Sequence, residues 1–159
     1  DWGGTIMNRY LSRDNKSRHR RYTSDVFEMA AAIVNQASIN CIAIYPNNLN
    51  ELPEHEIDFL KGVPTTWDET RFIDGYPGKY VVMARRHGAD WYVVGLNGTD
   101  KTLNLNLNLD MLAGKSVSYY YETPDKKSLW PASHVKKLNI GKNSKTKVMM
   151  QPNGGFIIK

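Results

Sequence analysis

The chain has 159 residues, of which 41% are hydrophobic and 23% are charged, and these proportions are ordinary for a globular protein. This length suits one domain, or one small domain with part of another. No apolar run is long enough to form a membrane helix, so the sequence predicts no membrane span. The formal net charge of +5 is common among proteins that bind no polyanion, and we expect no nucleic acid partner.

The amino-terminal part begins with DWGGTIMNRYL, which has no initiating Met and no signal-peptide pattern, so we expect a chain cut from a longer protein. Residues 12–24, SRDNKSRHRRYTS, are polar and basic and are expected to form an exposed loop. The next stretch, DVFEMAAAIVNQ, predicts a helix over 25–36. Asp25 is expected to cap it, with Glu28 three residues later returning the bond.

The run INCIAIYP predicts a strand over 39–45 that is buried on both faces, as in a parallel sheet. Its Cys41 is the only cysteine of the chain and is expected to be a small buried hydrophobe. Pro53 begins, and Gly62 ends, a second predicted helix over 53–61. This order of helix, strand and helix cannot enclose a core by itself, so it indicates the last portion of an α/β domain.

From Thr65 onward, apolar residues alternate over short runs separated by the turn signals DGYPG, HGAD and PNGG. KYVVMARR and WYVVGLNG predict a hairpin around HGAD, and KTLNLNLNL places its leucines on one face. We count roughly eight strands, and an antiparallel β-sandwich would bury one face of each of its two sheets. The sequence therefore predicts a mostly β chain, with residues 1–62 forming a helix-strand-helix remnant and residues 63–159 forming the sandwich.

Three segments resemble a known family. They are TSDVFEMAAAIVNQASINCIAIYPNNL, the long irregular run PTTWDETRFIDGYPGKYVVMARR and the closing QPNGGFIIK. Together they resemble the carboxyl-terminal part of glycoside hydrolase family 97, over nearly the whole chain. The resemblance implies an enzyme with an amino-terminal β-sandwich, a central (β/α)8 barrel and a carboxyl-terminal β-sandwich. Residues 1–62 would then end the barrel, and residues 63–159 would be the final sandwich.

The resemblance also implies an activity for the parent protein, which would hydrolyse terminal α-linked glucose or galactose from oligosaccharides, with an α-glucosidase as the first expectation. Glycoside hydrolysis generally needs two carboxyl groups that flank the scissile bond. In the family, these carboxylates and the glutamates that hold an active-site calcium match nothing in this chain, and we expect them upstream of Asp1. The chain alone is therefore expected to have no catalytic residue, to bind no calcium and to be inactive. A periplasmic or exported location is likewise implied by the family.

Barrel geometry indicates where a part of the substrate site would remain in this chain. Active sites of such barrels form at the carboxyl ends of the strands and in the loops that follow. This points to Tyr45, Asn47 and Asn48 after the predicted strand, although YPNN is equally a turn. Asp1 and Trp2 become further rim candidates if DWGG belongs to the preceding strand-to-helix loop.

The segment Trp67-Asp68-Glu69 lies in the stretch from Val63 to Gly98, which mixes apolar alternation with an unusual density of charge. Adjacent residues of an extended strand point to opposite faces, so Asp68 and Glu69 cannot be a facing acid and base pair. We expect Trp67, Asp68, Glu69 and Arg71 to act at the domain junction, with Trp67 packed against the barrel. The carboxylates are expected to pair with one or more arginines of the set Arg71, Arg85 and Arg86.

Two alternatives follow from the residues alone. A stand-alone carbohydrate-binding β-sandwich module would use an exposed aromatic platform. Its candidates are Trp91, Tyr119, Tyr120, Tyr121 and Trp130. A nucleic-acid binder would use the tract from Arg18 to Arg21 and a set of strand lysines. These are Lys136, Lys137, Lys142, Lys145 and Lys147. The four histidines, at positions 19, 55, 87 and 134, have no metal-ligand spacing, and no phosphate-binding glycine loop is present.

Overall fold

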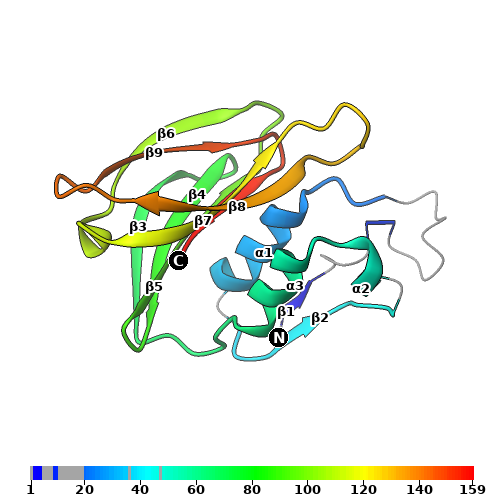
Figure 1. The fold of residues 1–159 in the computed structure, drawn as a ribbon, viewed down its shortest axis with the longest axis horizontal. Helices are drawn as coiled ribbons and strands as arrows, with labels where there is room; N and C mark the ends of the chain where they lie inside the picture. Colours follow the sequence, from blue (N-terminus) through cyan, green and yellow to red (C-terminus); the bar gives the residue numbers. More distant parts are fainter. Residues whose placement is uncertain (1, 5–8, 11–19, 36, 47) are drawn as a thin grey trace.

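The structure is a computed structural model that describes residues 2–4, 9–10, 20–35, 37–46 and 48–159, with the backbone alone for the first of these ranges. Two groups of elements lie against each other (Figure 1). The first contains helices and a short parallel strand pair. The second contains antiparallel strands only, so the described part of the chain is mostly β, as the sequence predicts.

The first group follows the order strand, helix, strand, helix, helix. Its elements are β1 (Trp2–Gly4), α1 (Asp25–Val34), β2 (Asn40–Ile42), α2 (Asn48–Glu51) and α3 (Glu54–Lys61). β1 and β2 pair in parallel, with Trp2 opposite Asn40 and Gly4 opposite Ile42. The helix over 25–36 and the helix over 53–61 therefore exist within one or two residues of their expected ends.

The N-cap of helix α1 lies one residue earlier than expected. Ser24 is the N-cap residue, and its Oγ accepts a hydrogen bond of 3.0 Å from the backbone N–H of Phe27. The prediction that Asp25 caps the helix is wrong, because its carboxylate is buried and occupied by arginines. Glu28 accepts a 2.6 Å hydrogen bond from the Thr23 hydroxyl, where the sequence predicted a bond from the cap backbone.

Strand β2 is shorter and more open than predicted for residues 39–45. Cys41 is exposed, Ile39 is 56% exposed and Ile44 is 43% exposed, so the expected burial of this segment is wrong here. The physical reason is the lack of cover, because β2 pairs with β1 alone among the described residues. The apolar sequence of this strand matches a sheet with more neighbours than the described chain supplies.

The second group contains eight strands, in agreement with the expected number. They are β3 (Glu69–Tyr76), β4 (Tyr80–His87), β5 (Asp90–Asn97), β6 (Leu103–Asn108), β7 (Ser116–Thr123), β8 (Ala132–Asn139), β9 (Lys145–Met150) and β10 (Gly155–Ile158). The predicted hairpin around HGAD is present, with His87 opposite Asp90. A 3-10 turn, Asp110–Leu112, follows β6.

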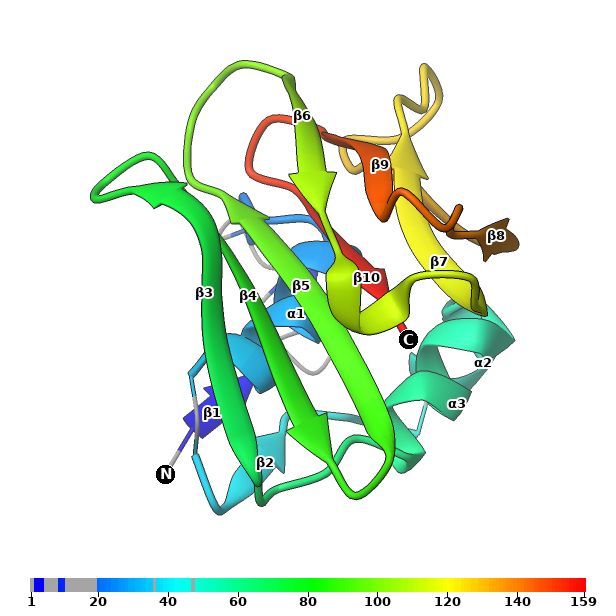
Figure 2. The ribbon, with the colours of Figure 1, turned by 90° about the vertical axis from the view of Figure 1, so that its left-hand side faces the viewer.

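These strands form one sheet of six and one of two. The six-stranded sheet has the order β3-β4-β5-β10-β7-β8, and β6 pairs with β9 (Figure 2). β10 lies between β5 and β7 and is antiparallel to both, with Ile157 opposite Val94 and Tyr120. The closing strand therefore joins one half of the sheet to the other.

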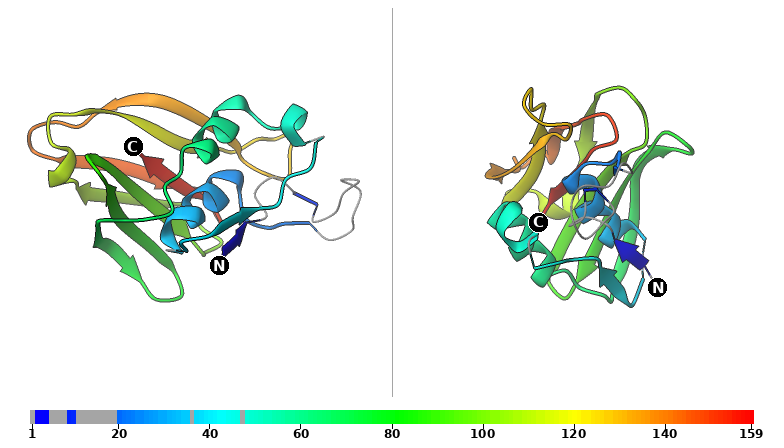
Figure 3. Two further views of the ribbon diagram at one scale, coloured as in Figure 1. Left: turned by 90° about the horizontal axis from the view of Figure 1, so that it is seen from below. Right: turned by 90° about the vertical axis from the view of Figure 1, so that its right-hand side faces the viewer.

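The six-stranded sheet is covered on both faces, whereas the sequence predicted one buried face per sheet. The β6-β9 pair covers one face, and α1 and α3 cover the other (Figure 3). Alternate residues of β5 serve the two cores, with Val93 in the sandwich core and Val94 against the helices. β10 does the same with Ile158 and Ile157. The unbroken apolar runs WYVVGL and FII are the sequence signal of this double cover.

Close approach of β5 and β10 requires glycine. A Cβ atom at Gly95 would lie 2.2 Å from Cε1 of Phe156 and 2.9 Å from Sδ of Met150. A Cβ atom at Gly155 would lie 2.7 Å from the carbonyl oxygen of Gly95 and 3.2 Å from Cα of Phe27 in α1. These two positions let the sheet and the helix pack without a gap.

We predict that Gly95→Ala lowers the free energy of unfolding by about 1–3 kcal/mol, since the added methyl group must displace the Phe156 ring. Gly62→Ala is the matched control, because a Cβ atom there meets no atom closer than 3.7 Å. Urea unfolding of both variants measures the difference. Equal stability of the two variants would contradict the close packing at Gly95.

Candidate functional site

Three carboxylates are buried where the helices meet the six-stranded sheet. Asp25 begins α1, Glu56 lies in α3 and Glu122 lies in β7, and they are 1%, 0% and 2% exposed. An ionised carboxylate at such a place is costly unless cations or hydrogen bonds compensate. A different set of partner groups surrounds each of the three carboxylates.

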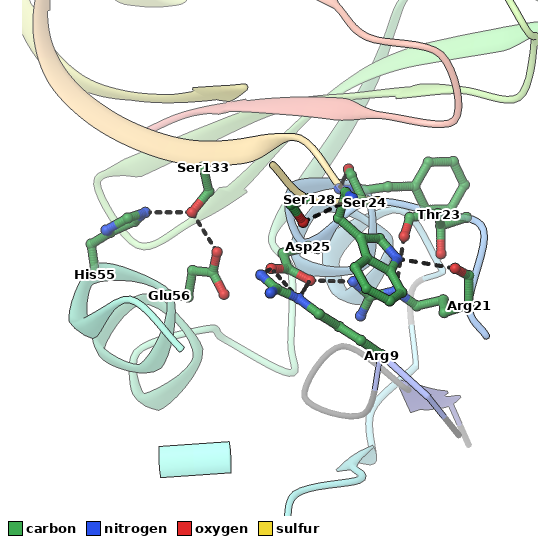
Figure 4. A network of polar contacts seen from close by, with 11 residues as sticks. Arg9, Arg21, Thr23, Ser24, Asp25, His55, Glu56, Ser128 and Ser133 are labelled. Atoms are coloured by element: carbon green, nitrogen blue, oxygen red, sulfur yellow. Dashed lines mark hydrogen bonds and ion pairs between the residues drawn. The ribbon is translucent and has the colours of Figure 1, made fainter. Parts of the chain in front are cut away.

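Asp25 is held between two arginines. Arg9 and Arg21 each donate to its carboxylate, and the Arg21 guanidinium also donates to the backbone oxygen of Thr23 at 2.8 Å (Figure 4). Trp130 closes this ion cluster, because its Nε1 donates to the Arg21 carbonyl oxygen at 3.0 Å and Arg9 lies over its ring at 5.6 Å. Arg21, expected in an exposed loop, is therefore buried and structural.

Glu56 is hydrogen-bonded through a serine of the sheet. The Ser133 hydroxyl in β8 donates to Glu56 Oε1, and His55 Nε2 lies 2.9 Å from the same hydroxyl oxygen. Glu56 Oε2 has no hydrogen-bond partner within the described part of the chain. Burial raises the pKa of Glu56 well above the usual range of a glutamate, and the nearby Asp25 charge adds to this. Burial also lowers the pKa of His55, which favours the neutral imidazole.

Glu122 reaches from β7 to the first turn of α1. Its Oε2 accepts a 3.3 Å hydrogen bond from the Gly155 N–H, and it also bonds to Ser24 and to the Val26 backbone. Burial raises the pKa of Glu122 to about 7, because these hydrogen bonds offset only part of the desolvation. A carboxyl from the sandwich thus helps to satisfy a buried helix start.

This arrangement holds the fold together and offers no facing acid and base pair. Asp25 is neutralised by its arginines, and none of the three carboxylates lines one of the three hollows that described residues form. Three surface hollows of about 410, 480 and 480 Å³ are lined by described residues. The first and third contain one carboxylate each, Asp90 and Asp74, and the second contains none. No hollow of this set supplies the two carboxyl groups that glycoside hydrolysis needs.

The predicted rim residues have different outcomes. Asp1 and Asn47 lie outside the described residues. Residues Trp2–Gly4 form strand β1, so the loop expected at this position is wrong. Trp2 is the first residue of this strand and does not lie in a loop after its end. Asn48 is buried, and its Oδ1 accepts a 2.9 Å hydrogen bond from the Tyr45 N–H, which fixes the turn into α2. A sugar contact by Tyr45 or Asn48 stays a prediction.

Trp67 packs against the sheet on its helix-facing side. Its ring meets the Tyr92 ring edge-on, with centroids 5.4 Å apart, and belongs to the core that α1 and α3 share with the sheet. Arg85 is buried in the same place, where its Nη2 donates to the Val34 carbonyl oxygen at the end of α1, at 3.1 Å. Trp67 and Arg85 are therefore placed between the helices and the sandwich.

The two carboxylates beside Trp67 pair with arginines other than Arg85. Arg86 lies 3.5 Å from Asp68 Oδ2 and 3.4 Å from Glu69 Oε2, and Arg71 Nε lies 2.7 Å from Glu69 Oε1. These pairs are solvent-accessible, and such ion pairs typically contribute about 0–1 kcal/mol. The junction role of this set stays a prediction.

The aromatic platform of the alternative module is largely buried. Trp91, Tyr119 and Trp130 belong to the cores, and Tyr120 points to the helix side, where its ring lies 5.1 Å from that of Phe59 in α3. Tyr121 is half-buried and stacks on the Tyr119 ring with centroids 5.2 Å apart. These five rings therefore do not form a flat exposed array. Of the basic tract, Arg18 lies outside the described residues, Arg20 is exposed and Arg21 is buried.

The described residues do not fit a calcium site. No group of three or more His, Cys, Asp or Glu side chains able to hold a metal ion occurs in the described ranges. Calcium needs several oxygen ligands around one point. Each of the three buried carboxylates instead contacts its own set of protein groups. None of the helices in the described ranges is long and apolar enough to cross a membrane.

Sequence reasoning missed Arg9, Glu56 and Glu122. Glu56 lies one helical turn before Phe59, on the buried side of α3, and Glu122 is two residues after Tyr120 on one face of β7. A carboxylate at a position where the pattern requires an apolar residue is the signal that marks both. Arg9 had no such signal, because its role depends on residues far along the chain.

Comparisons with known proteins agree with a domain of this kind. The family model for the carboxyl-terminal, oligomerisation domain of glycosyl hydrolases 97 matches residues 66–159. The retaining α-galactosidase of Bacteroides thetaiotaomicron is 33% identical over 135 residues, which cover 83% of this chain and 20% of that protein. The chain thus spans about a fifth of the length of this curated relative.

Solved structures extend the likeness to the whole chain. The crystal structure of a β-arabinopyranosidase matches with a TM-score of 0.91 and 44% identity, covering 100% of this chain and 25% of that one. A family 97 enzyme from Pseudoalteromonas sp. strain K8, in complex with panose, matches with a TM-score of 0.67 at 20% identity, covering 88% and 23%, and this shows the fold alone.

The fold and the buried contacts define a mostly β domain in which the buried carboxylates connect the helices to the sheet. The chain belongs to the carboxyl-terminal domain family of glycoside hydrolase family 97, as its sequence indicates.

We predict that Asp25→Asn lowers the free energy of unfolding by about 3–5 kcal/mol, because two arginine charges at a buried site lose their counter-ion. Asp58→Asn is the control, since it removes an exposed partner of Lys61 in α3 and should cost less than about 0.5 kcal/mol. Chemical denaturation at pH 7 compares the two. Similar losses would show that the Asp25 cluster is not structural.

Because burial raises the pKa of Glu122, we predict that the free energy of unfolding falls as pH rises. Below about pH 4.5 the carboxyl is protonated in both the folded and the unfolded state, and from there to about pH 7 only the folded state holds the proton. The free energy of unfolding should therefore fall over this window, by up to about 3 kcal/mol from Glu122, and level off above it. Burial of Glu56 acts in the same direction and extends the fall to higher pH.

Glu122→Gln should remove its share of this pH dependence, which unfolding measurements at pH 5 and pH 8 would detect. Glu54→Gln changes an exposed glutamate of α3 and serves as the control. An unchanged difference between the two pH values in Glu122→Gln would refute the buried, protonated carboxyl.

Proposed function

We propose that this chain is the carboxyl-terminal portion of a larger family 97 glycosidase, that residues 1–62 complete its (β/α)8 barrel, and that the sandwich supports this barrel without taking part in catalysis. The observation that carries the proposal is the β1-α1-β2 unit. It is a parallel strand pair with a helix between the strands, which is the repeating unit of such barrels.

The exposed side of this unit supports missing barrel neighbours. Ile39, Ile44 and Leu49 are large, apolar and exposed around β2 and α2. Apolar residues around a parallel strand are normally covered on both faces by helices. Further barrel strands and helices from the upstream part of the parent protein would supply that cover.

The buried polar contacts support a rigid connection between barrel and sandwich. Arg85 of β4 bonds to the end of α1, Glu122 of β7 bonds to its start, and Ser133 of β8 bonds to Glu56 of α3. Strands from both halves of the sheet thus hold the two helices. The sandwich would fix the last helices of the barrel, and through them the strand ends where substrate binds.

For the substrate of the parent we propose a terminal α-galactoside or a β-arabinopyranoside. The relatives that share 33% and 44% identity with this chain carry the names α-galactosidase and β-arabinopyranosidase. α-D-Galactopyranosides and β-L-arabinopyranosides have the same ring configuration and differ by the hydroxymethyl group at C5, so one pocket shape can accept either. The first expectation of an α-glucoside becomes the second candidate, since the enzyme in complex with panose is only 20% identical.

The catalytic carboxylates would lie upstream, and the α-galactosidase named as retaining favours a nucleophilic carboxylate as one of them. Calcium binding by the intact enzyme and a periplasmic location remain part of this proposal as implications of the family. The described residues contribute no ligand set to calcium, so we derive no step through it.

The test compares the full-length protein with the 159-residue chain on nitrophenyl α-galactopyranoside, β-L-arabinopyranoside and α-glucopyranoside. We expect the full-length protein to hydrolyse the first two faster than the third, and the chain alone to hydrolyse none. Turnover by the purified chain would overturn its non-catalytic role. Preference of the full-length protein for the glucoside would overturn the substrate assignment and leave the scaffold role standing.

A further inference from the structure

The connection between β1 and α1 covers residues 5–24, of which the structure describes 9–10 and 20–24. Strands β1 and β2 are parallel, so the helix between them runs back along the strands and begins on the side where β1 ends. In a (β/α)8 barrel, the connections on this side form the substrate site. The described residues of this connection would therefore lie on the substrate side of the proposed barrel.

Buried contacts join the two described parts of the connection. The Arg21 N–H donates to the Arg9 carbonyl oxygen at 2.8 Å, and both guanidinium groups bind the Asp25 carboxylate in the first turn of α1 (Figure 4). The Ser24 N–H donates to the carbonyl oxygen of Asn153, in the turn before β10, at 3.0 Å. The path of the chain into α1 is therefore fixed both by its own arginines and by the sandwich.

Trp130 of the sandwich contacts three residues of this connection. Its Nε1–H donates to the Arg21 carbonyl oxygen at 3.0 Å. The Arg9 guanidinium lies 5.6 Å from its ring centroid, and the Tyr10 ring meets it edge-on, with centroids 5.3 Å apart. Because Trp130 is only 6% exposed, loss of its N–H would leave a buried carbonyl oxygen without this donor.

The loop between β7 and β8 presents Trp130 in a fixed position. The Ser128 N–H donates to the Asp125 carbonyl oxygen at 3.4 Å, as in a β-turn, and the Lys127 N–H donates to Asp125 Oδ1 at 2.8 Å. The Trp130 N–H then donates to Ser128 Oγ at 3.1 Å, and Pro131 restricts the chain that follows. The backbone of the sandwich thus sets the position of the indole.

We propose that Trp130 is a positioning residue of the parent enzyme. It holds the connection through Arg9, Tyr10 and Arg21, and so it sets the contacts that this side of the barrel makes with the substrate. Its effect is on substrate binding, since the carboxylates that cleave the glycosidic bond are expected upstream. The inference rests on the proposed barrel and adds a role in substrate binding to the supporting role of the sandwich.

The test is the steady-state kinetics of the full-length protein on the nitrophenyl glycoside that it hydrolyses fastest. Trp130→Phe keeps an aromatic ring for Arg9 and Tyr10 but removes the donor to the Arg21 carbonyl oxygen. We expect KM to rise about threefold to tenfold, the scale of one hydrogen bond, and kcat to stay within about twofold. Tyr10→Leu removes the ring that meets Trp130 edge-on, and this second variant should raise KM about twofold to threefold.

Trp91→Phe is the matched control. Trp91 is also buried, at 9% exposed, and it also lies against two arginines, with Arg71 at 4.7 Å and Arg86 at 5.9 Å from its ring centroid. It belongs to the core that faces the β6-β9 pair, so the same chemical change is made away from the connection. This variant should leave KM unchanged.

Trypsin cleavage of the folded protein after Arg20 gives a second measurement that needs no substrate. Arg20 is exposed and Arg21 is buried, so cleavage between them requires local opening of the cluster. We expect this cleavage to be about threefold to tenfold faster in Trp130→Phe and unchanged in Trp91→Phe.

Three results would overturn this inference and leave the proposed function standing. An unchanged cleavage rate in Trp130→Phe would show that Trp130 does not hold the connection. Faster cleavage with an unchanged KM would leave Trp130 a structural role only, and equal changes of KM in both tryptophan variants would indicate a general loss of packing. A full-length protein that hydrolyses none of the nitrophenyl glycosides would instead overturn the proposed function and this inference together.

Discussion

The burial of both faces of the six-stranded sheet is the constraint on which the rest of this structure depends. Tyr92, Val94 and Ile157 face the helices, while their neighbours in β5 and β10 face the β6-β9 pair. Without α1 and α3, an apolar sheet face would meet water, at a cost of about 25 cal/mol for each Å² exposed. The helices and the six-stranded sheet therefore share one of the two cores, even though the sequence pattern changes between these two parts of the chain.

This shared core explains the buried polar groups. Helix α1 can lie flat on the sheet only if its first turn is also buried, and the free N–H groups of that turn then need partners from within the protein. Ser24 and Glu122 supply them, and the charge of Asp25 is balanced by Arg9 and Arg21. Polar residues at the helix start thus follow from apolar packing along the rest of the helix.

The positions of the helices and strands could be predicted from the sequence better than the burial of their residues. The helices, the strand number and the hairpin at HGAD follow from local patterns that depend on neighbouring residues. The burial of Cys41, the exposure of Arg21 and the single buried face of the sheet were predicted wrongly, because each depends on residues distant in the chain. The carboxylate cluster was missed for the same reason, since Ser133 is 77 residues from Glu56 and Trp130 is 109 residues from Arg21.

The position of β10 has a consequence for the order of folding. β3, β4 and β5 are joined by short turns and can pair as a local meander, and β7 and β8 form a second local unit. Among the described strands, β10 joins these two units into one sheet, through hydrogen bonds along both of its edges. Until it inserts, each unit presents an unpaired strand edge, which is the template that aggregating chains use. The continuity of the sheet therefore depends on a strand of four residues whose pairing is non-local, and non-local pairing is the kind that slows folding.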